Sequence, residues 1–407
     1  MTNSTKGNAV IGQSGGPTSV INQSLVGVIQ AAKKAGHIDK LLGARHGVSG
    51  VIEEKFISLK EIPDELLERI AATPSAALGS TRDKPDQSYC EKIYRVFAKN
   101  NVRFFYYIGG NDSADTARIV GELAAREGYD LQVFHVPKTI DNDLRVHDHT
   151  PGFGSAARFV ASAIIGDDYD NKSLPGVKVD VIMGRNAGFL TAASVLARKY
   201  ENDGPHLIYV PEADFDTDKF LADVDRVYKK LDRCVIAVSE GIHNRQGTPM
   251  AVALAESQGQ KVERDAHGNV QLSGSGELGD FLGNLIKSKL GIKRVRSDTF
   301  GYLQRSFPGL VSEVDAQEAR LVGVKAVEFS ADPANKELSV VIKRVSNTPY
   351  KIEIDKTSIK NVARETKHLS PEYIENGNNI TQAFIDYAKP LIGKLPVIGS
   401  FDEIKKT

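Results

Sequence analysis

The chain has few cysteines, no net charge and no long hydrophobic run, and each of these absences excludes a class of protein. Only Cys90 and Cys234 occur among the 407 residues. They form no CxxC pair and have no histidine cluster nearby, so neither a disulfide framework nor a zinc site is indicated, and we expect two buried apolar thiols. The 52 Lys and Arg residues balance 52 Asp and Glu residues. This balance gives no general reason to expect a nucleic acid or an anionic membrane as partner.

Segments that would direct the chain to a membrane are also missing. Residues 1–6 carry no apolar signal segment, and no window approaches the roughly 20 apolar residues that a membrane span needs. We therefore expect a cytoplasmic protein without a membrane partner. Hydrophobic residues make up 41% and charged residues 26%, which are ordinary values for a globular protein. The length suits two or three domains, of which we favour two.

The chain alternates apolar runs with amphipathic segments. Strands are predicted at 8–12, 102–108, 131–136, 177–182, 207–210 and 235–238, and helices at 20–32, 62–72, 189–198, 217–231, 277–290 and 314–326. Because strand, helix and strand in succession build right-handed βαβ units, this order predicts an α/β fold with mainly parallel sheets covered by helices. In such sheets ligands bind outside the carboxyl ends of the strands.

A stiff polar turn follows the predicted strand at 131–136. Pro137 fixes its own φ and keeps the preceding residue extended, so the strand should stop there. The turn that follows holds Lys138, Asp141 and Asp143. One cation and two carboxylates on a stiff turn suit a catalytic site. The alternative is that the aspartates only accept hydrogen bonds from local N–H groups.

A glycine-rich loop at residues 13–19 joins the first strand to the first helix. Paired glycines and a helix N-terminus let backbone N–H groups approach an anion, so phosphate binding is one interpretation. The loop matches neither GxGxxG nor the Walker A pattern, and a simple tight turn is the other interpretation. Arg82, in a later turn of small residues, could clamp a phosphate with two N–H groups or be a solvated surface residue.

Asn111 and Asp112 follow the strong strand at 102–108. Both residue types cap helices well, because their side chains satisfy the free N–H groups of the first turn. A carboxylate beside a phosphate loop is also a usual way to hold Mg²⁺. Strand after strand ends in Gly, Arg, Lys, Asp or Glu, and this repetition favours one site that binds an anionic ligand.

Seven motifs, in this order, closely resemble those of the phosphofructokinase family over about residues 8–330. They are SGGPTSVIN at 14–22, LGSTR at 78–82, GGND at 109–112, PKTIDND at 137–143, MGRNAG at 183–188, SEG at 239–241 and GYLQRS at 301–306. The resemblance implies an enzyme that phosphorylates fructose 6-phosphate at its 1-hydroxyl, in a cleft between two similar Rossmann-like domains. These would be a phosphoryl-donor domain at 1–150, rejoined by about 303–345, and a sugar-phosphate domain at 151–302, with a C-terminal extension of hairpin and helix at 346–407.

The resemblance also implies roles for individual residues. Asp141 would be the base that accepts the hydroxyl proton, with Thr139 beside it at the sugar-phosphate site. Gly15, Arg82 and Lys138 would contact the phosphoryl donor. The other sugar-phosphate contacts would be Ile140, Met183, Gly184, Arg185, Glu240, Tyr302, Leu303, Gln304 and Arg305, together with Arg296 reaching the sugar from a neighbouring subunit of a homodimer.

Two positions bear on the choice of phosphoryl donor. ATP-dependent members of the family carry glycine at the positions of Asp112 and Lys138, whereas pyrophosphate-dependent members carry Asp and Lys. A carboxylate at Asp112 would repel a nucleotide triphosphate, and Lys138 would neutralise charge on the leaving phosphate. We therefore predict reversible transfer from pyrophosphate to fructose 6-phosphate, giving fructose 1,6-bisphosphate and phosphate, in glycolysis and gluconeogenesis.

Two departures from the family pattern concern the metal and regulation. Many members have Asp at the position of Asn111, which is associated with Mg²⁺, and a neutral amide offers an oxygen without a charge. Asp112 or Asp143 would then carry more of the Mg²⁺ binding. Val26 and Gln30 stand where allosteric bacterial members place arginines for effectors, so we predict a non-allosteric enzyme.

Three other interpretations compete with a pyrophosphate-dependent enzyme. In an ATP-dependent phosphofructokinase, Asp112 and Lys138 would be a helix cap and a surface charge. A non-catalytic sugar-phosphate sensor would need neither the base Asp141 nor Lys138. A dinucleotide-binding oxidoreductase would need a GxGxxG after the first strand and an acidic residue at the end of the second, and both are missing.

The remaining segments carry no recognisable chemistry. Residues 262–276 are predicted to be an exposed hairpin or loop. The tail is predicted to form strands at 340–345 and 350–354 and a helix at 380–391. We assign no site residue to this tail.

Overall fold

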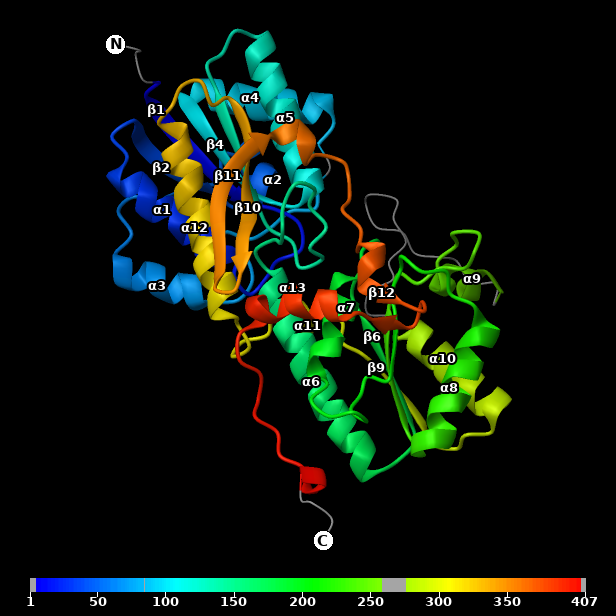
Figure 1. Ribbon diagram of the computed structural model, residues 1–407. Helices are drawn as coiled ribbons and strands as arrows, with labels where there is room; N and C mark the ends of the chain where they lie inside the picture. Colours follow the sequence, from blue (N-terminus) through cyan, green and yellow to red (C-terminus); the bar gives the residue numbers. More distant parts are fainter. Residues whose placement is uncertain (1–4, 84, 258–275, 404–407) are drawn as a thin grey trace.

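Two mainly parallel sheets, in separate halves of the molecule, form the framework (Figure 1). The computed structural model describes residues 5–83, 85–257 and 276–403. The larger sheet has seven strands in the order β11-β10-β5-β4-β1-β2-β3. They are β1 (Gly7–Gln13), β2 (Ile38–Ala44), β3 (Phe56–Ser58), β4 (Val102–Gly109), β5 (Gln132–Pro137), β10 (Glu337–Asn347) and β11 (Tyr350–Ser358). Only the edge strands β3 and β11 pair in the antiparallel sense.

The smaller sheet has four strands in the order β7-β8-β6-β9, all parallel. They are β6 (Val177–Ile182), β7 (Leu207–Tyr209), β8 (Cys234–Ser239) and β9 (Val295–Thr299). A short antiparallel pair, β12 (Ile374–Glu375) and β13 (Asn379–Ile380), lies beside β7.

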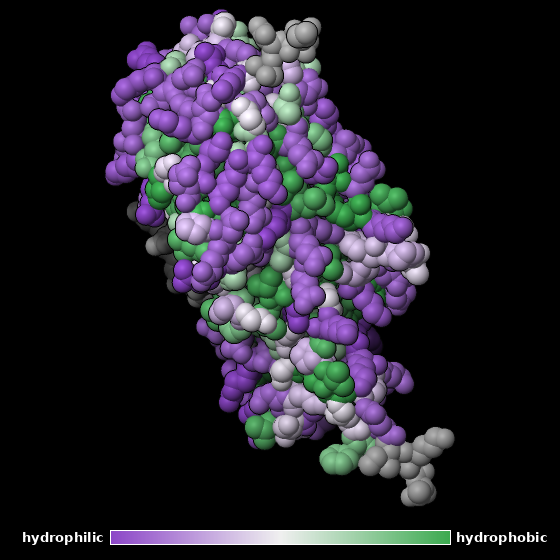
Figure 2. Space-filling view, turned by 90° about the vertical axis from the view of Figure 1, so that its left-hand side faces the viewer, coloured by the Kyte–Doolittle hydropathy of each residue, from purple (hydrophilic) through white to green (hydrophobic). Residues whose placement is uncertain are grey.

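Helices bury their apolar sides against both faces of each sheet. On the larger sheet, α1 (Ile21–Lys34), α3 (Asp64–Ala72) and α12 (Glu313–Ser330) cover one face, and α2 (Gly47–Ile52), α4 (Gln87–Lys99) and α5 (Asn111–Arg126) cover the other. On the smaller sheet, α6 (Phe153–Ser173), α7 (Phe189–Ala193) and α13 (Gln382–Ile392) cover one face, and α8 (Thr217–Leu231) and α10 (Glu277–Leu290) cover the other. The outer sides of these helices are polar, and Figure 2 shows a mainly hydrophilic surface on the side of the molecule that α1, α3 and α12 occupy.

α1 and α12 cross very closely because each has a glycine at the crossing. A Cβ atom added to Gly27 of α1 would lie 2.2 Å from the backbone oxygen of Arg320. One added to Gly323 of α12 would lie 2.2 Å from the backbone oxygen of Ser24. Both distances are far below van der Waals contact, so only glycine fits at this separation of the two backbones.

The structure confirms the predicted α/β fold and most of its elements. The predicted helix at 189–198 is shorter: α7 ends at Ala193 and a 3₁₀ turn, Ser194–Ala197, follows. The predicted tail strands are β10 and β11, and β10 pairs with β5, which extends the larger sheet. Cys90 and Cys234 are free and buried, as expected. Residues 262–275, most of the predicted exposed loop, lie outside the described residues.

None of the helices in the described part of the chain combines the length and the apolar character needed to cross a membrane.

Candidate functional site

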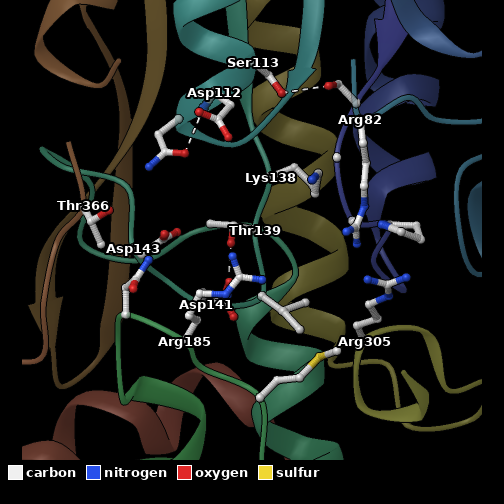
Figure 3. Close-up of a pocket in the computed structure, with 18 of the residues that line it drawn as sticks. Arg82, Asp112, Ser113, Lys138, Thr139, Asp141, Asp143, Arg185, Arg305 and Thr366 are labelled. Carbon is white, nitrogen blue, oxygen red and sulfur yellow. Dashed lines mark hydrogen bonds between the residues drawn. The ribbon is translucent and has the colours of Figure 1, made fainter. Parts of the chain in front are cut away.

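A pocket of about 480 Å³ lies between the two sheets, at the carboxyl ends of their strands (Figure 3). The loops after β1, β4 and β5 line it from the larger sheet, and the loops after β6 and β8 line it from the smaller. The strand order of the larger sheet reverses between β1 and β4, which is where parallel α/β sheets bind ligands. Charged groups of both signs line the pocket: Arg82, Lys138, Arg185, Arg305 and Arg364, and Asp83, Asp112, Asp141, Asp143 and Glu240.

The turn after β5 is fixed at both ends. The backbone N–H of Lys138 donates to the oxygen of Gly109 at 3.0 Å, which ties the turn to the end of β4. Asn142 adopts a positive φ of 59°, and its amide donates to the Tyr387 hydroxyl at 2.7 Å while its oxygen accepts from the N–H of Thr150 at 3.1 Å. The asparagine therefore makes the structural contacts of this turn, which leaves the two neighbouring aspartates to line the pocket.

Asp141 lies in the pocket wall and is partly buried. Burial disfavours its carboxylate, and the negative charges of Asp143 and Glu240 add to this effect, so that the pKa of Asp141 is raised to about 7. Burial likewise raises the pKa of Asp143. A carboxylate with a pKa near neutrality can take up a proton from a ligand and return it.

Lys138 is 3% exposed and lies against the glycine loop. A Cβ atom added to Gly15 would lie 3.2 Å from Nζ of Lys138, and one added to Gly16 would lie 3.1 Å from a guanidinium nitrogen of Arg305. Gly15 also has a positive φ of 75°. Burial, followed by the charge of Arg305, lowers the pKa of Lys138 to about 8. The glycines thus leave room for two cations at one wall of the pocket.

The turn that carries Arg82 is bound to the glycine loop. The N–H of Gly15 donates to the oxygen of Thr81 at 2.9 Å, and the Ser80 hydroxyl donates to the oxygen of Gly15 at 2.6 Å. This pairing brings Arg82 to the same wall as Lys138 and Arg305 (Figure 3). The loop predicted to bind phosphate and the arginine predicted to clamp it are therefore adjacent.

Asn111 and Asp112 form the first turn of α5, whereas the N-cap position of the helix is held by Gly110, which has no side chain to cap it. The Asn111 side chain accepts from the N–H of Asp112 at 2.8 Å. The Ser113 hydroxyl donates to the Ser14 hydroxyl at 2.9 Å, which joins the first turn of α5 to the loop after β1. Asn111 and Asp112 also line the pocket. Neither residue occupies the N-cap position that the capping interpretation gave them.

The smaller sheet contributes Met183, Arg185 and Glu240 to the opposite wall. Gly184 has a φ of 141° and its oxygen accepts from the Ser239 hydroxyl at 2.6 Å, which joins the loops after β6 and β8. A Cβ atom added to Gly241 would lie 2.0 Å from the oxygen of Arg185, so glycine is required there.

Four of the predicted site residues do not line the pocket: Gly184, Arg296, Leu303 and Gln304. Gln304 is buried, and its side-chain oxygen accepts from the N–H of Met183 at 3.1 Å, so it supports a wall residue. Leu303 is 62% exposed. Arg296 is exposed on β9, an edge strand of the smaller sheet, and is not among the residues that line the pocket. The remaining predicted residues line the pocket together.

The pocket also includes residues that the sequence did not single out. Ser14, Thr81, Asp83, Ser113 and Asn186 belong to, or adjoin, motifs quoted above, so their position is a direct consequence of those motifs. Arg364 and Thr366 come from the tail, where no motif marked them. The sequence motifs placed no site residue in the tail, and the structure adds these two to the pocket wall.

Oxygen ligands suitable for Mg²⁺ are present in the pocket. Asn111 offers an amide oxygen, and Asp112 and Asp143 offer carboxylates. Burial raises the pKa of Asp141 most, and the negative charges of Asp143 and Glu240 add to this effect; a divalent cation would neutralise that charge. Within the described residues, a close group of three carboxylates occurs elsewhere, at Asp167, Asp180 and Asp298, where Lys178 pairs with two of them.

Known proteins share both the sequence and this arrangement. The sequence matches the phosphofructokinase family over residues 8–330. A pyrophosphate--fructose 6-phosphate 1-phosphotransferase from Rhodospirillum rubrum is 52% identical over 390 residues, which cover 96% of this chain and 95% of that protein. A protein of the same name from Halomonas elongata is 38% identical over 396 residues, which cover 95% of this chain and 91% of that protein.

A solved structure agrees with these matches. The crystal structure of a pyrophosphate-dependent phosphofructokinase from Marinobacter aquaeolei has a TM-score of 0.83 and 33% identity, and covers 98% of this chain and 95% of that chain. The match therefore includes both sheets, the pocket between them and the tail. This chain belongs to the phosphofructokinase family.

Proposed function

We propose that this chain is a pyrophosphate-dependent phosphofructokinase, which transfers a phosphoryl group reversibly from pyrophosphate to the 1-hydroxyl of fructose 6-phosphate. The products are fructose 1,6-bisphosphate and phosphate. The observation that carries the proposal is the turn after β5, which presents Lys138 and Asp141 to one pocket that the glycine loop, Arg82, Arg185 and Arg305 also line. The Rhodospirillum rubrum relative, whose name states this reaction, supports it over nearly the whole chain.

Asp141 is the base in the proposed reaction. With the sugar against the smaller-sheet wall, the carboxylate accepts the proton of the 1-hydroxyl as that oxygen attacks the terminal phosphorus of pyrophosphate. Phosphoryl transfer is catalysed mainly by positioning and charge. Lys138 and Arg82 line the pocket beside the glycine loop and stabilise the negative charge of the leaving phosphate.

The choice of donor follows from Asp112 and Lys138. Asp112 places a carboxylate in the first turn of α5, at the pocket, where the additional phosphate of a nucleotide would extend. Like charges repel strongly at such short range, so the residue selects the shorter donor. Lys138, whose Nζ lies close to Gly15, occupies space that a glycine would leave open.

Fructose 6-phosphate is bound by the smaller-sheet wall in this proposal. Met183, Arg185 and Glu240 contact the sugar, together with Thr139 and Ile140, and Tyr302 and Arg305 lie at its phosphate. Arg296 is exposed and does not line the pocket of its own chain, so we assign it to the sugar site of a partner in a homodimer. The residues of the larger sheet form the donor side.

Mg²⁺ fits the acidic side of the pocket, where Asp143, Asp112 and the amide oxygen of Asn111 would hold it. When bound, it supplies a Lewis acid that neutralises charge on the phosphates.

Regulation through the first helix is not part of the proposal. Val26 is fully buried in the core, and the Gln30 amide donates to the carboxylate of Glu68 at 3.0 Å. Both positions are thus occupied by structural contacts, and neither offers a charge to an effector. The enzyme is proposed to act without allosteric control, in the cytoplasm.

The test compares initial rates of fructose 6-phosphate phosphorylation with pyrophosphate and with ATP, both with Mg²⁺. We expect turnover with pyrophosphate and none with ATP. The double variant Asp112→Gly with Lys138→Gly should lose at least about 100-fold in rate with pyrophosphate, because a charge-stabilising group is removed. Asp83→Gly, which removes another pocket carboxylate, is the control and should keep the donor preference. Turnover with ATP alone would refute the assignment of the donor.

A further inference from the structure

A segment of the tail crosses the pocket from one half of the molecule to the other. We call residues 363–369 the strap. At its start, the Arg364 guanidinium donates to the Asp115 carboxylate of α5 at 2.9 Å. At its end, Leu369 is buried in the core of the smaller sheet, and its N–H donates to the Glu212 carboxylate at 2.8 Å. The strap therefore has one anchor on each side of the pocket.

Between its anchors, the strap forms one edge of the pocket. Arg364 and Thr366 line the pocket, and Figure 3 shows Thr366 close to Asp143. The His368 ring bonds to the oxygen of Asn186 at 2.8 Å, and Asn186 is itself a wall residue. The strap is thus continuous with the walls of the site.

Lys367 binds the strap to the turn that carries Asp141. Its backbone N–H donates to the oxygen of Asp143 at 2.7 Å, and Thr366 forms an isolated antiparallel bridge with Leu144. Its ammonium donates to the backbone oxygens of His147 at 3.0 Å and Asp148 at 2.8 Å. One residue therefore holds the loop after Asp141 at three points.

The choice of lysine here has no simple packing explanation. The ammonium is directed at two backbone oxygens inside the protein, and it lies 5.0 Å from the centre of the Phe189 ring. Removing a charge from water is costly, and a methionine of similar length would fill the same space without this cost. The two hydrogen bonds to the loop offset the cost of removing the ammonium from water. We therefore connect the charge of Lys367 with the position of the loop.

We propose that the strap is part of the active site and that Lys367 is a positioning residue, which holds the loop of residues 141–148 in the geometry that phosphoryl transfer needs. The inference rests on the proposed function for its effect on rate, since Asp141 is the base in that reaction. Its structural content, the clamp on the loop, can be tested without turnover.

The experiment compares Lys367→Met with Lys360→Met. Lys360 lies just before the strap, is 60% exposed and pairs with Glu122 at the surface, so its loss should change little. In Lys367→Met we expect kcat to fall about 100-fold while both KM values stay within about threefold, because a misplaced base slows the chemical step rather than binding. A kcat within about twofold of the wild type would overturn the proposal, as would an equal loss in Lys360→Met.

Two further variants separate charge from packing. Lys367→Arg keeps a cation with several donors, whereas Lys367→Gln keeps the length approximately and loses the charge. The arginine variant should have the higher kcat, and the reverse order would overturn the proposal. If Lys367→Met does not fold, the comparison of the kcat values of Lys367→Arg and Lys367→Gln still tests the proposal.

Amide hydrogen exchange provides a readout without substrate. Residues 139–148 should exchange faster in Lys367→Met than in the wild type and Lys360→Met, and unchanged exchange would overturn the clamp. If the wild type does not use pyrophosphate, the proposed function fails. The exchange experiment, and the kcat ratio with whichever donor the wild type uses, still test the strap.

Discussion

Asp141 and Asn142 are neighbours in the chain and have separate tasks. Asn142 adopts the left-handed backbone conformation and makes hydrogen bonds to Tyr387 and Thr150, so it shapes the turn. Asp141 keeps its carboxylate at the pocket, where burial and nearby negative charge raise its pKa to about 7. Because Asn142 makes the hydrogen bonds that shape the turn, the Asp141 carboxylate can face the ligand.

This separation predicts the effect of Asp141→Asn. The variant keeps the shape of the residue but cannot accept the proton, so kcat should fall by about 10³-fold, within the range measured for general bases. Binding of fructose 6-phosphate, measured by titration calorimetry, should stay within about threefold. Asp83→Asn, at another pocket carboxylate, is the matched control and should retain most activity. Substantial turnover in Asp141→Asn would remove this residue from the role of base.

At the scale of elements, the crossing of α1 and α12 is fixed by backbone contact. Gly27→Ala would place a methyl group 2.2 Å from the oxygen of Arg320, so the helices must separate. We expect a loss of about 2 kcal/mol in the free energy of unfolding, as is usual for overpacked cores. Urea denaturation measures it.

The control for this change is Gly166→Ala in α6. A Cβ atom there meets nothing within 4 Å, so the only effect is the better helix propensity of alanine. The variant should gain up to about 1 kcal/mol. Equal changes in the free energy of unfolding for Gly27→Ala and Gly166→Ala would contradict the close backbone contact between α1 and α12.

A buried polar network joins the strand pair β10 and β11 to α12. His149 bonds to the Asp148 carboxylate at 2.7 Å and to the Glu318 carboxylate at 2.6 Å, and Tyr350 donates to Glu318. Burial alone would lower the pKa of His149, but the hydrogen bonds and charges of these two carboxylates raise it. Arg344 also pairs with Asp148.

This network predicts a dependence of stability on pH. Because the folded state raises the pKa of His149, its stabilisation is complete below about pH 6.5 and is lost as the pH rises through the folded pKa. The difference in unfolding free energy between the wild type and His149→Gln should therefore shrink as the pH rises above about 6.5. In His206, burial lowers the pKa to about 4, so for His206→Gln the difference should change only below about pH 6.5. A constant difference for His149→Gln would refute the assignment.

At the scale of the whole molecule, the site is proposed to be completed by a second copy of the chain. Arg296 lies on the edge strand β9 and does not line its own pocket. If Arg296 serves the partner's pocket, each site takes Asp141 from one chain and Arg296 from the other. A mixed dimer of Asp141→Asn and Arg296→Ala then has one site with both changes and one site with neither. Refolding the two inactive variants together should restore about a quarter of wild-type activity, because half of the dimers are mixed and each has one intact site. No recovery would place Arg296 outside the sugar site.

The sequence by itself determined the α/β class, the parallel strands and most of the pocket. Apolar runs that alternate with amphipathic segments allow few other folds, and residues that follow parallel strands must gather at one edge of a sheet. Pro137 and the paired glycines are local signals of backbone geometry, and for this reason the turn after β5 and the loop after β1 could be predicted without a structure.

Only the tertiary structure decided the role of the tail. The pairing of β10 with β5 and the path of the strap across the pocket depend on contacts between residues some 200 positions apart, such as Lys367 with His147. No local pattern encodes such contacts, because they join segments that are far apart in the sequence and meet only in the folded chain. The same holds for Gln304, whose contact with Met183 has no counterpart in sequence spacing. The sequence therefore predicted the pocket residues that lie in local motifs. It did not predict the strap, which forms one edge of the pocket.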